Sequence, residues 1–239
     1  MYSSAYPHDP IEQLFPDVFW VHGSIRVGPG MRLNRNMIIL REGKELTLIN
    51  PVRLQEEALR ELDALGQVAR VVRLGDFHGL DDQYYVDRYQ CLFWGQSGQS
   101  TYSSPEIDVL VDEASPGPVR DSQFFVYRNA VYPEAALLVK KHRLLITTDS
   151  LQYHRDWRHF SGFTRVVFKL FGFHRGMNIG GPWLKRVTPK GGSLQHDFER
   201  LIQLDFDALV GAHGQVLRMG AKAAVRAEVR HLYGYEEEV

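Results

Sequence analysis

The fold class is indicated most clearly by two consecutive segments, Val68-Ala-Arg-Val-Val-Arg-Leu74 and Gly75-Asp-Phe-His-Gly-Leu-Asp-Asp-Gln83. Its first seven residues are mostly apolar and rich in valine, which predicts a strand covered on both faces, as in the sheets of α/β proteins. The polar residues that follow then lie at the carboxyl end of this strand, where α/β folds usually place their functional sites. A helix is predicted from residue 80 to about residue 89.

The residues before this strand predict an antiparallel meander and a helix. Short segments at residues 17–22, 36–41 and 45–50 are rich in β-branched and aromatic residues, and glycines punctuate them. Between residues 54 and 65 apolar side chains recur every three or four positions, which predicts a helix with one buried face. Gly66 is placed to end that helix.

The residues after the central strand repeat the order of strands and then helices. Residues 95–104, rich in serine, glycine and glutamine, predict an exposed loop. Strands are predicted at residues 91–94, 107–111, 123–128, 135–140, 143–148 and 208–211, helices at 193–204 and 221–232, and a helical insertion at about 150–192. With no low-complexity linker, this order predicts a single α/β domain over residues 1–239. A four-layer αββα sandwich accounts for it, although the pattern also fits other α/β arrangements.

The composition fits a globular protein without a strongly charged partner. The 239 residues are 44% apolar and 24% charged, and the formal net charge of −1 predicts neither nucleic acid nor an anionic membrane as a partner. Cys91 is the single cysteine, so a disulfide within the chain and a thiolate zinc site are excluded, and Cys91 is predicted to be a small core residue. The N-terminus lacks the pattern of a secretory signal, and residues 163–173 are too short to cross a bilayer. A cytoplasmic protein is expected.

Three segments place carboxylates or imidazoles directly after predicted strands. They are Asp76-Phe-His-Gly-Leu-Asp-Asp82, Thr147-Thr-Asp-Ser150 and Gly211-Ala-His-Gly214. Their oxygen and nitrogen donors suit zinc, iron or manganese. Each also has a structural explanation, because Asp149 could cap a helix, His213 could stabilise a turn, and Asp81 and Asp82 could complement a helix dipole. Their shared position at strand ends favours a common site.

Residues along most of the chain resemble the metallo-β-lactamase fold. Asn36-Met-Ile-Ile-Leu40 with Leu48-Ile-Asn-Pro51 looks like the opening hairpin of that superfamily. Thr148-Asp149-Ser150 is similar to the strand end that carries its metal-bridging aspartate. The segment Asp205-Phe-Asp-Ala-Leu-Val-Gly-Ala-His-Gly214 is similar to the one that carries its last metal-binding histidine. The resemblance is strongest to divergent members with a degraded metal motif, and it implies the αββα sandwich and metal-dependent hydrolysis.

The main metal motif of the superfamily reads His-x-His-x-Asp-His, and this chain departs from it. The preferred register places His78 on the first histidine and Asp82 on the aspartate, while Leu80 and Gln83 replace the other two histidines. A further histidine expected near residues 129–134 is absent. An alternative register uses Asp76, His78 and Asp81 as ligands, and it puts Leu80 at the position of the aspartate.

The resemblance implies that one of the two metal positions survives. The position that needs three histidines retains His78, whereas the other retains Asp82, Asp149 and His213. Three protein ligands with open positions suit a catalytic ion, so one divalent metal is predicted, with zinc preferred over iron or manganese. Such an ion activates water for attack on a small-molecule ester, thioester, amide or phosphoester. Asp82 would ligate the ion or orient the water, and His78 could shuttle protons.

The lost ligands also support a different class of function. Leu80, Gln83 and the missing middle histidine are what a non-catalytic relative would carry. Such a protein keeps the fold as a binding or scaffold module and binds no metal.

The predicted insertion carries three further histidines, His154, His159 and His174, among many aromatic residues. It could cover the pocket as a lid, form the interface of a homodimer, or pack as ordinary helix. His154 is the nearest of the three to Asp149, and it could replace a lost ligand.

Overall fold

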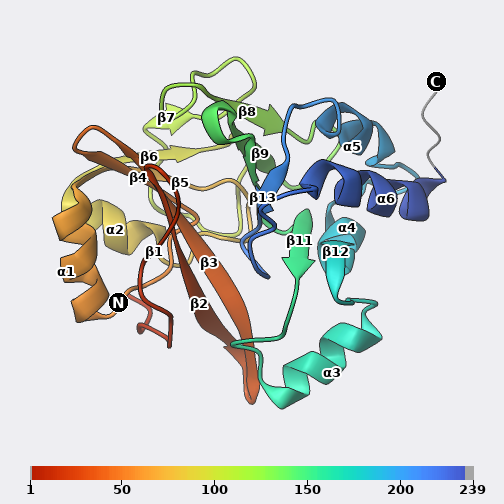
Figure 1. Cartoon of the computed structure of the whole chain (residues 1–239), viewed down its shortest axis with the longest axis horizontal. Coiled ribbons are helices and arrows are strands. Elements are labelled where there is room, and N and C mark those ends of the chain that lie inside the picture. The colour runs from red at the N-terminus through yellow and green to blue at the C-terminus, as the bar shows by residue number, and fades with distance from the viewer. Residues whose placement is uncertain (1, 235–239) are drawn as a thin grey trace.

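The predicted N-terminal meander begins a seven-stranded sheet in the computed structural model, which describes residues 2–234 (Figure 1). The strands lie in the order β1 (Glu12–Phe15), β2 (Val18–Gly28), β3 (Met31–Glu42), β4 (Glu45–Ile49), β5 (Gln67–Val72), β6 (Leu92–Gly95) and β7 (Val109–Leu110). The first four strands are antiparallel, and β4 to β7 are parallel. Parallel neighbours need crossover connections, and α1 (Glu56–Leu65) and α2 (Asp82–Tyr89) supply two of them.

A second sheet has four strands, in the order β13, β10, β9, β8. These are β13 (Ala208–Val210), β10 (Leu144–Ile146), β9 (Ala135–Val139) and β8 (Ser122–Val126), and the 3-10 turn η1 (Lys140–His142) joins β9 to β10. β10 pairs with β13 in parallel and with β9 antiparallel. The start of β9 therefore lies at the same edge of the sheet as the ends of β10 and β13.

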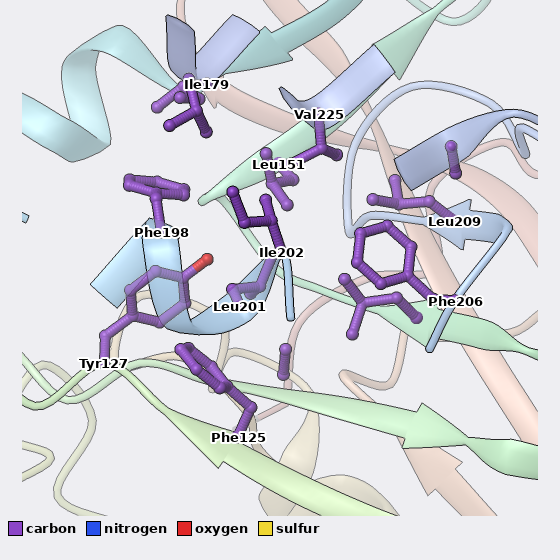
Figure 2. Close-up of a cluster of buried hydrophobic side chains, with 14 of the residues drawn as sticks. Phe125, Tyr127, Leu151, Ile179, Phe198, Leu201, Ile202, Phe206, Leu209 and Val225 are labelled. Atoms are coloured by element: carbon purple, nitrogen blue, oxygen red, sulfur yellow. The ribbon is translucent and has the colours of Figure 1, made fainter. Parts of the chain in front are cut away.

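Three buried apolar clusters separate four layers, which confirms the αββα sandwich. Because side chains alternate along a strand, Phe19 packs beneath α1 and α2, whereas Trp20 faces the second sheet. Phe124 and Phe125 of β8 divide in the same way, and Phe125 faces the C-terminal helices. Figure 2 shows that outer cluster, where side chains of α5 (Gln195–Leu201) and α6 (Ala221–Tyr233) meet the second sheet. No helix within residues 2–234 is long and apolar enough to cross a membrane.

Strands β2 and β3 extend well beyond the predicted residues 17–22 and 36–41. Polar side chains that are unusual inside a sheet lie in or next to the additional segments: Asn34 belongs to the extension of β3, His22 and Asn36 lie at the ends of the predicted strands, and all three are buried. Their side chains hydrogen-bond to one another, so their burial leaves few polar atoms unsatisfied. The residue types did not predict these extensions because hydrogen-bonded polar side chains stand where a buried strand usually has apolar ones.

The insertion after Asp149 is not wholly helical, which corrects the prediction for residues 150–192. It contains a two-stranded sheet of β11 (Leu151–His154) and β12 (Gly176–Ile179), with α3 (Gly162–Leu170) between them and α4 (Gly181–Val187) after them. The strands have four residues each, too short to give a clear alternating pattern. Figure 1 shows α3 near the tip of the β2–β3 hairpin, where the Ser161 hydroxyl donates to the carbonyl of Gly30. α3 exposes Phe163 and Leu170, and a homodimer through this face stays a prediction.

Candidate metal centre

Three strand ends bring His78, Asp149 and His213 together. Ile146 of β10 pairs with Val210 of β13, and Asp149 and His213 each lie three residues beyond this pair. Parallel pairing therefore places the two side chains beside each other. His78 comes from the loop between β5 and α2 in the facing sheet, so the cluster lies between the two sheets at one edge.

The two imidazoles converge on one carboxylate. His78 Nε2 lies 3.2 Å from Asp149 Oδ2, and His213 Nε2 lies 3.1 Å from Asp149 Oδ1. The ligand atoms of the three residues all lie within 4.8 Å of one another. Two ligands of a tetrahedral zinc ion are about 3.3 Å apart, as zinc–ligand distances near 2.0–2.1 Å require. The spacing and the N, O, N donor set therefore fit one divalent ion.

The protonation states of the cluster also suit a metal. Burial lowers the pKa of His78 more than the neighbouring Asp149 carboxylate raises it, so the imidazole favours its neutral form. Burial raises the pKa of the Asp149 carboxyl, but the charge that His78 carries when it is protonated and hydrogen bonds from both histidines outweigh this and hold the pKa well below its usual range. Neutral imidazole and ionised carboxylate are the forms that bind metals.

A hydrogen bond at Nδ1, the ring nitrogen that does not face Asp149, fixes the orientation of the His213 ring. Its Nδ1 lies 2.6 Å from the backbone oxygen of Asn34 on β3, which accepts a hydrogen bond. Because Nδ1 donates that bond, Nε2 is the ring atom that faces Asp149, and it would bind an ion once it releases its own hydrogen, as in most histidines that bind metals. The Asn34 side chain also accepts a hydrogen bond from the backbone N–H of Gly214. By contrast, the buried Nδ1 of His78 has no hydrogen-bond partner among the described residues.

The structure does not bring Asp82 into this cluster. Asp82 begins α2 and is fully buried, and its Oδ2 accepts a hydrogen bond from Arg73 Nε at 2.6 Å. The two carboxylates of the alternative register also have other partners than this cluster. Asp81 pairs with Arg35 at 2.9 Å, and Asp76 accepts hydrogen bonds from the backbone of Ser100 and Thr101.

Glu134 is a candidate site residue that the sequence reasoning missed. It lies directly before β9 and is 1% exposed, where a histidine was sought and not found. Its Oε1 accepts hydrogen bonds from the Thr148 hydroxyl and the Ser150 N–H, on either side of Asp149. Burial raises the pKa of Glu134 to about 8, and repulsion from Asp149 adds to the rise. The sequence signal that could have identified Glu134 is its position immediately before five apolar residues, 135–139.

The histidines of the insertion lie outside the cluster. His154 is buried and stacks on Trp157, with 4.8 Å between the ring centroids. His159 contacts Asp9, near the N-terminus, instead. The structure therefore does not use His154 to replace a lost ligand at this position.

A cavity of about 250 Å³ opens beside Asp149 and His213. Its walls are mainly apolar, with several aromatic rings, and come mostly from the insertion and from the loop that carries His78. They include Phe77, Phe168, Phe173, Trp183 and Arg186. The guanidinium of Arg186 lies over the ring of Phe77, with 4.2 Å between its Cζ atom and the centroid. A small molecule with an apolar portion would fit between these walls.

Several solved structures of metallo-β-lactamases are similar to this chain over nearly its whole length. DIM-1 metallo-β-lactamase aligns with a TM-score of 0.67 at 7% identity, over 96% of this chain and 100% of the other. FIM-1 from Pseudomonas aeruginosa, in its mono-zinc form, aligns with a TM-score of 0.65 at 8% identity, over 95% and 97%. A metallo-β-lactamase from Pontibacter korlensis aligns with a TM-score of 0.63 at 12% identity, over 94% and 99%.

Comparison by sequence gives no such likeness. No protein-family model matches the chain, and no curated protein does. At these identities the structural matches establish the fold, which the sequence resemblance predicted.

Proposed function

Because the chain has the metallo-β-lactamase fold, we propose that it is a metal-dependent hydrolase with a single catalytic ion held by His78, Asp149 and His213. The convergence of both Nε2 atoms on the Asp149 carboxylate carries this proposal. Zinc is preferred over iron or manganese for a site of two nitrogens and one oxygen. The mono-zinc form of FIM-1, which has the same fold, supports a single ion.

The residues of the chain divide the remaining tasks. A zinc ion at this position would act as a Lewis acid and would lower the pKa of a bound water to roughly 7. Asp149 offsets part of the charge of the ion, and Asn34 holds His213 in the tautomer that can ligate. Glu134 holds Thr148 and Ser150, so it is a positioning residue for Asp149. Asp82 was predicted to orient water, but it has no such role in this proposal because it pairs with Arg73.

The aromatic cavity supports a small-molecule substrate with an apolar portion. Phe77, Phe168 and Trp183 would exclude water around that portion and hold the scissile bond near Asp149. The bond to be hydrolysed is an ester, thioester, amide or phosphoester.

Removal and return of metal test the proposal. We expect chromogenic substrates of these four bond classes to reveal at least one that the zinc-loaded protein hydrolyses. Chelation should abolish the activity, and added zinc should restore it. Hydrolysis that continues in the metal-free protein would contradict the proposal. A protein that takes up no zinc and hydrolyses none of these substrates would favour the binding or scaffold module, for which the ion pair that keeps Asp82 from the cluster is the supporting observation.

Replacement of Glu134 by glutamine should change how stability depends on pH. The pKa of Glu134 is raised from 4.5 to about 8, so the folded protein holds a proton that the unfolded chain releases. The contribution of this proton to the free energy of unfolding is complete below pH 4.5 and is lost as the pH rises to 8. Metal-free wild type should therefore lose about 2 kcal/mol of unfolding free energy relative to Glu134→Gln between pH 6 and pH 7.5, because wild type releases one more proton when it unfolds.

Urea unfolding of both metal-free proteins at several pH values measures this difference. The comparison cancels the contribution of His78, whose lowered pKa has the opposite sign. Parallel pH profiles for the two proteins would show that Glu134 is ionised in the folded state.

A further inference from the structure

We infer that Asp9, His22 and His159 form a second metal site, separate from the metal centre, which binds a divalent transition ion such as zinc. The three residues come from the N-terminal segment, from β2 and from the loop between β11 and α3. Their ligand atoms all lie within 4.8 Å of one another. His159 Nε2 lies 3.3 Å from Asp9 Oδ1, and the rings of His22 and His159 are 5.0 Å apart between centroids.

The imidazole of His22 has the hydrogen-bond pattern of a ligand that lacks its metal. Its side chain is 4% exposed, and its Nδ1 lies 2.9 Å from Oδ1 of Asn36. The Asn36 amide nitrogen donates to the carbonyls of Gly211 and Gly214, which fixes Oδ1 as the acceptor facing His22. Nδ1 of His22 therefore carries the hydrogen, and the lone pair lies on Nε2.

That lone pair has nothing to bind among the described residues. Nε2 of His22 is buried without a hydrogen-bond partner, although buried polar atoms are almost always paired. Burial also lowers the pKa of His22 to about 4, so the ring is neutral at physiological pH. An ion that accepts the lone pair, next to the Asp9 carboxylate, would satisfy this atom.

His159 adopts a backbone conformation that is uncommon for residues other than glycine. Its φ of 65° lies in the left-handed region, and glycine is the residue that adopts it readily. Such a conformation costs free energy in residues other than glycine, so contacts with the surrounding structure must hold it. Here the conformation turns the His159 ring toward Asp9.

A cation already lies against the same carboxylate. Arg158 Nη2 is 2.9 Å from Asp9 Oδ1, and its side chain is 64% exposed. Arg158 and His159 both contact Oδ1, so Oδ2 of Asp9 stays available. Because the Arg158 side chain is exposed, it can move into solvent when an ion binds. A polar cavity of about 170 Å³, lined in part by Asp9 and His22, admits water to complete the coordination.

A chain of hydrogen bonds joins the second site to the metal centre. Asn36 Oδ1 contacts His22 and also accepts from Asn34 Nδ2 at 2.8 Å. Asn34 in turn accepts from His213 through its backbone oxygen. An ion at the second site therefore fixes one end of the network that orients His213. It also ties the N-terminal segment and the insertion to β2.

Counting bound zinc by native mass spectrometry tests the inference on the full chain. Metal-free protein is reloaded with zinc, and we expect two ions in wild type and one in His159→Gly. Glycine suits the left-handed backbone, so this variant should unfold thermally no earlier than metal-free wild type. His196→Gln, which removes an exposed histidine on α5, should still bind two ions. Arg158→Gln should bind the second ion several-fold more tightly, because a competing cation is lost.

The variant Asp149→Asn distinguishes the two sites. It should bind one ion, and the double variant Asp149→Asn/His159→Gly should bind none. If His159→Gly and wild type bind the same number of ions, the second site is overturned and the metal centre is unaffected. If His159→Gly loses an ion but Asp149→Asn does not, the second site stands and the proposed metal centre fails.

Discussion

Asp149→Asn is expected to lose one zinc ion per chain and to reduce hydrolysis at least about 100-fold. The carboxylate contacts both imidazoles, one through each oxygen, so an uncharged amide with a single acceptor oxygen cannot serve both histidines or bind an ion as strongly. Changing a group that merely orients a ligand costs 10- to 100-fold, and removing a ligand should cost more. Asparagine keeps the size of the side chain, which confines the change to charge and donor type. Elemental analysis and the rate of zinc-dependent hydrolysis measure the two effects.

Asp205→Asn is the matched control for this variant. Asp205 is exposed and pairs with Arg143 on the surface, far from the strand ends that carry the centre. Surface ion pairs contribute little to stability, so both metal content and activity should stay at wild-type levels. An Asp149→Asn protein that is folded, fully loaded with zinc and active would exclude His78, Asp149 and His213 as the catalytic centre.

Much of the site could be predicted because strand ends are easy to find. The strands before His78, Asp149 and His213 are short apolar runs, and the polar residue that follows each run marks the edge of a sheet. Where two such strands are parallel neighbours, equal offsets from their ends give spatial contact. Asp149 and His213 meet for this reason.

The features of the site that could not be predicted depend on contacts between residues far apart in the sequence. In sequence, Asp82 fits the position of the motif aspartate, and nothing nearby shows that Arg73 points inward and needs an anion. Glu134 shares its edge of the sheet with Asp149 only because β9 and β10 are antiparallel. The pairing of Asp9 with His159 joins positions far apart in the chain, which no local pattern predicts.

Arg73→Met is expected to destabilise the protein by roughly 3–5 kcal/mol, which is typical when one partner of a buried ion pair is removed. Arg73 and Asp82 are almost fully buried, so Asp82 would lose its counter-ion without gaining water. The guanidinium also donates to the carbonyls of Tyr102 and Ser104 and lies over Phe93. Urea unfolding of the metal-free proteins measures the loss.

The size of this loss should depend on pH. Burial raises the pKa of Asp82 to about 6, even though Arg73 lowers it. Without Arg73 the pKa rises further, and the carboxyl can escape its penalty by taking a proton. The cost of Arg73→Met should therefore be smaller at pH 5 than at pH 8. An equal cost at both values would mean that Asp82 is not the group that needs Arg73.

The double variant Arg73→Met/Asp82→Leu separates the two roles considered for Asp82. Replacing both partners of a buried pair with apolar residues avoids an unpaired charge, so it should be more stable than Arg73→Met alone. Some loss should remain, because the carbonyls of Tyr102 and Ser104 lose a donor. Its zinc content should equal that of wild type, since Asp82 lies outside the cluster of His78, Asp149 and His213. If the folded double variant lost the Asp149-dependent ion, Asp82 would be a ligand after all, and the ion pair with Arg73 would have to open when metal binds.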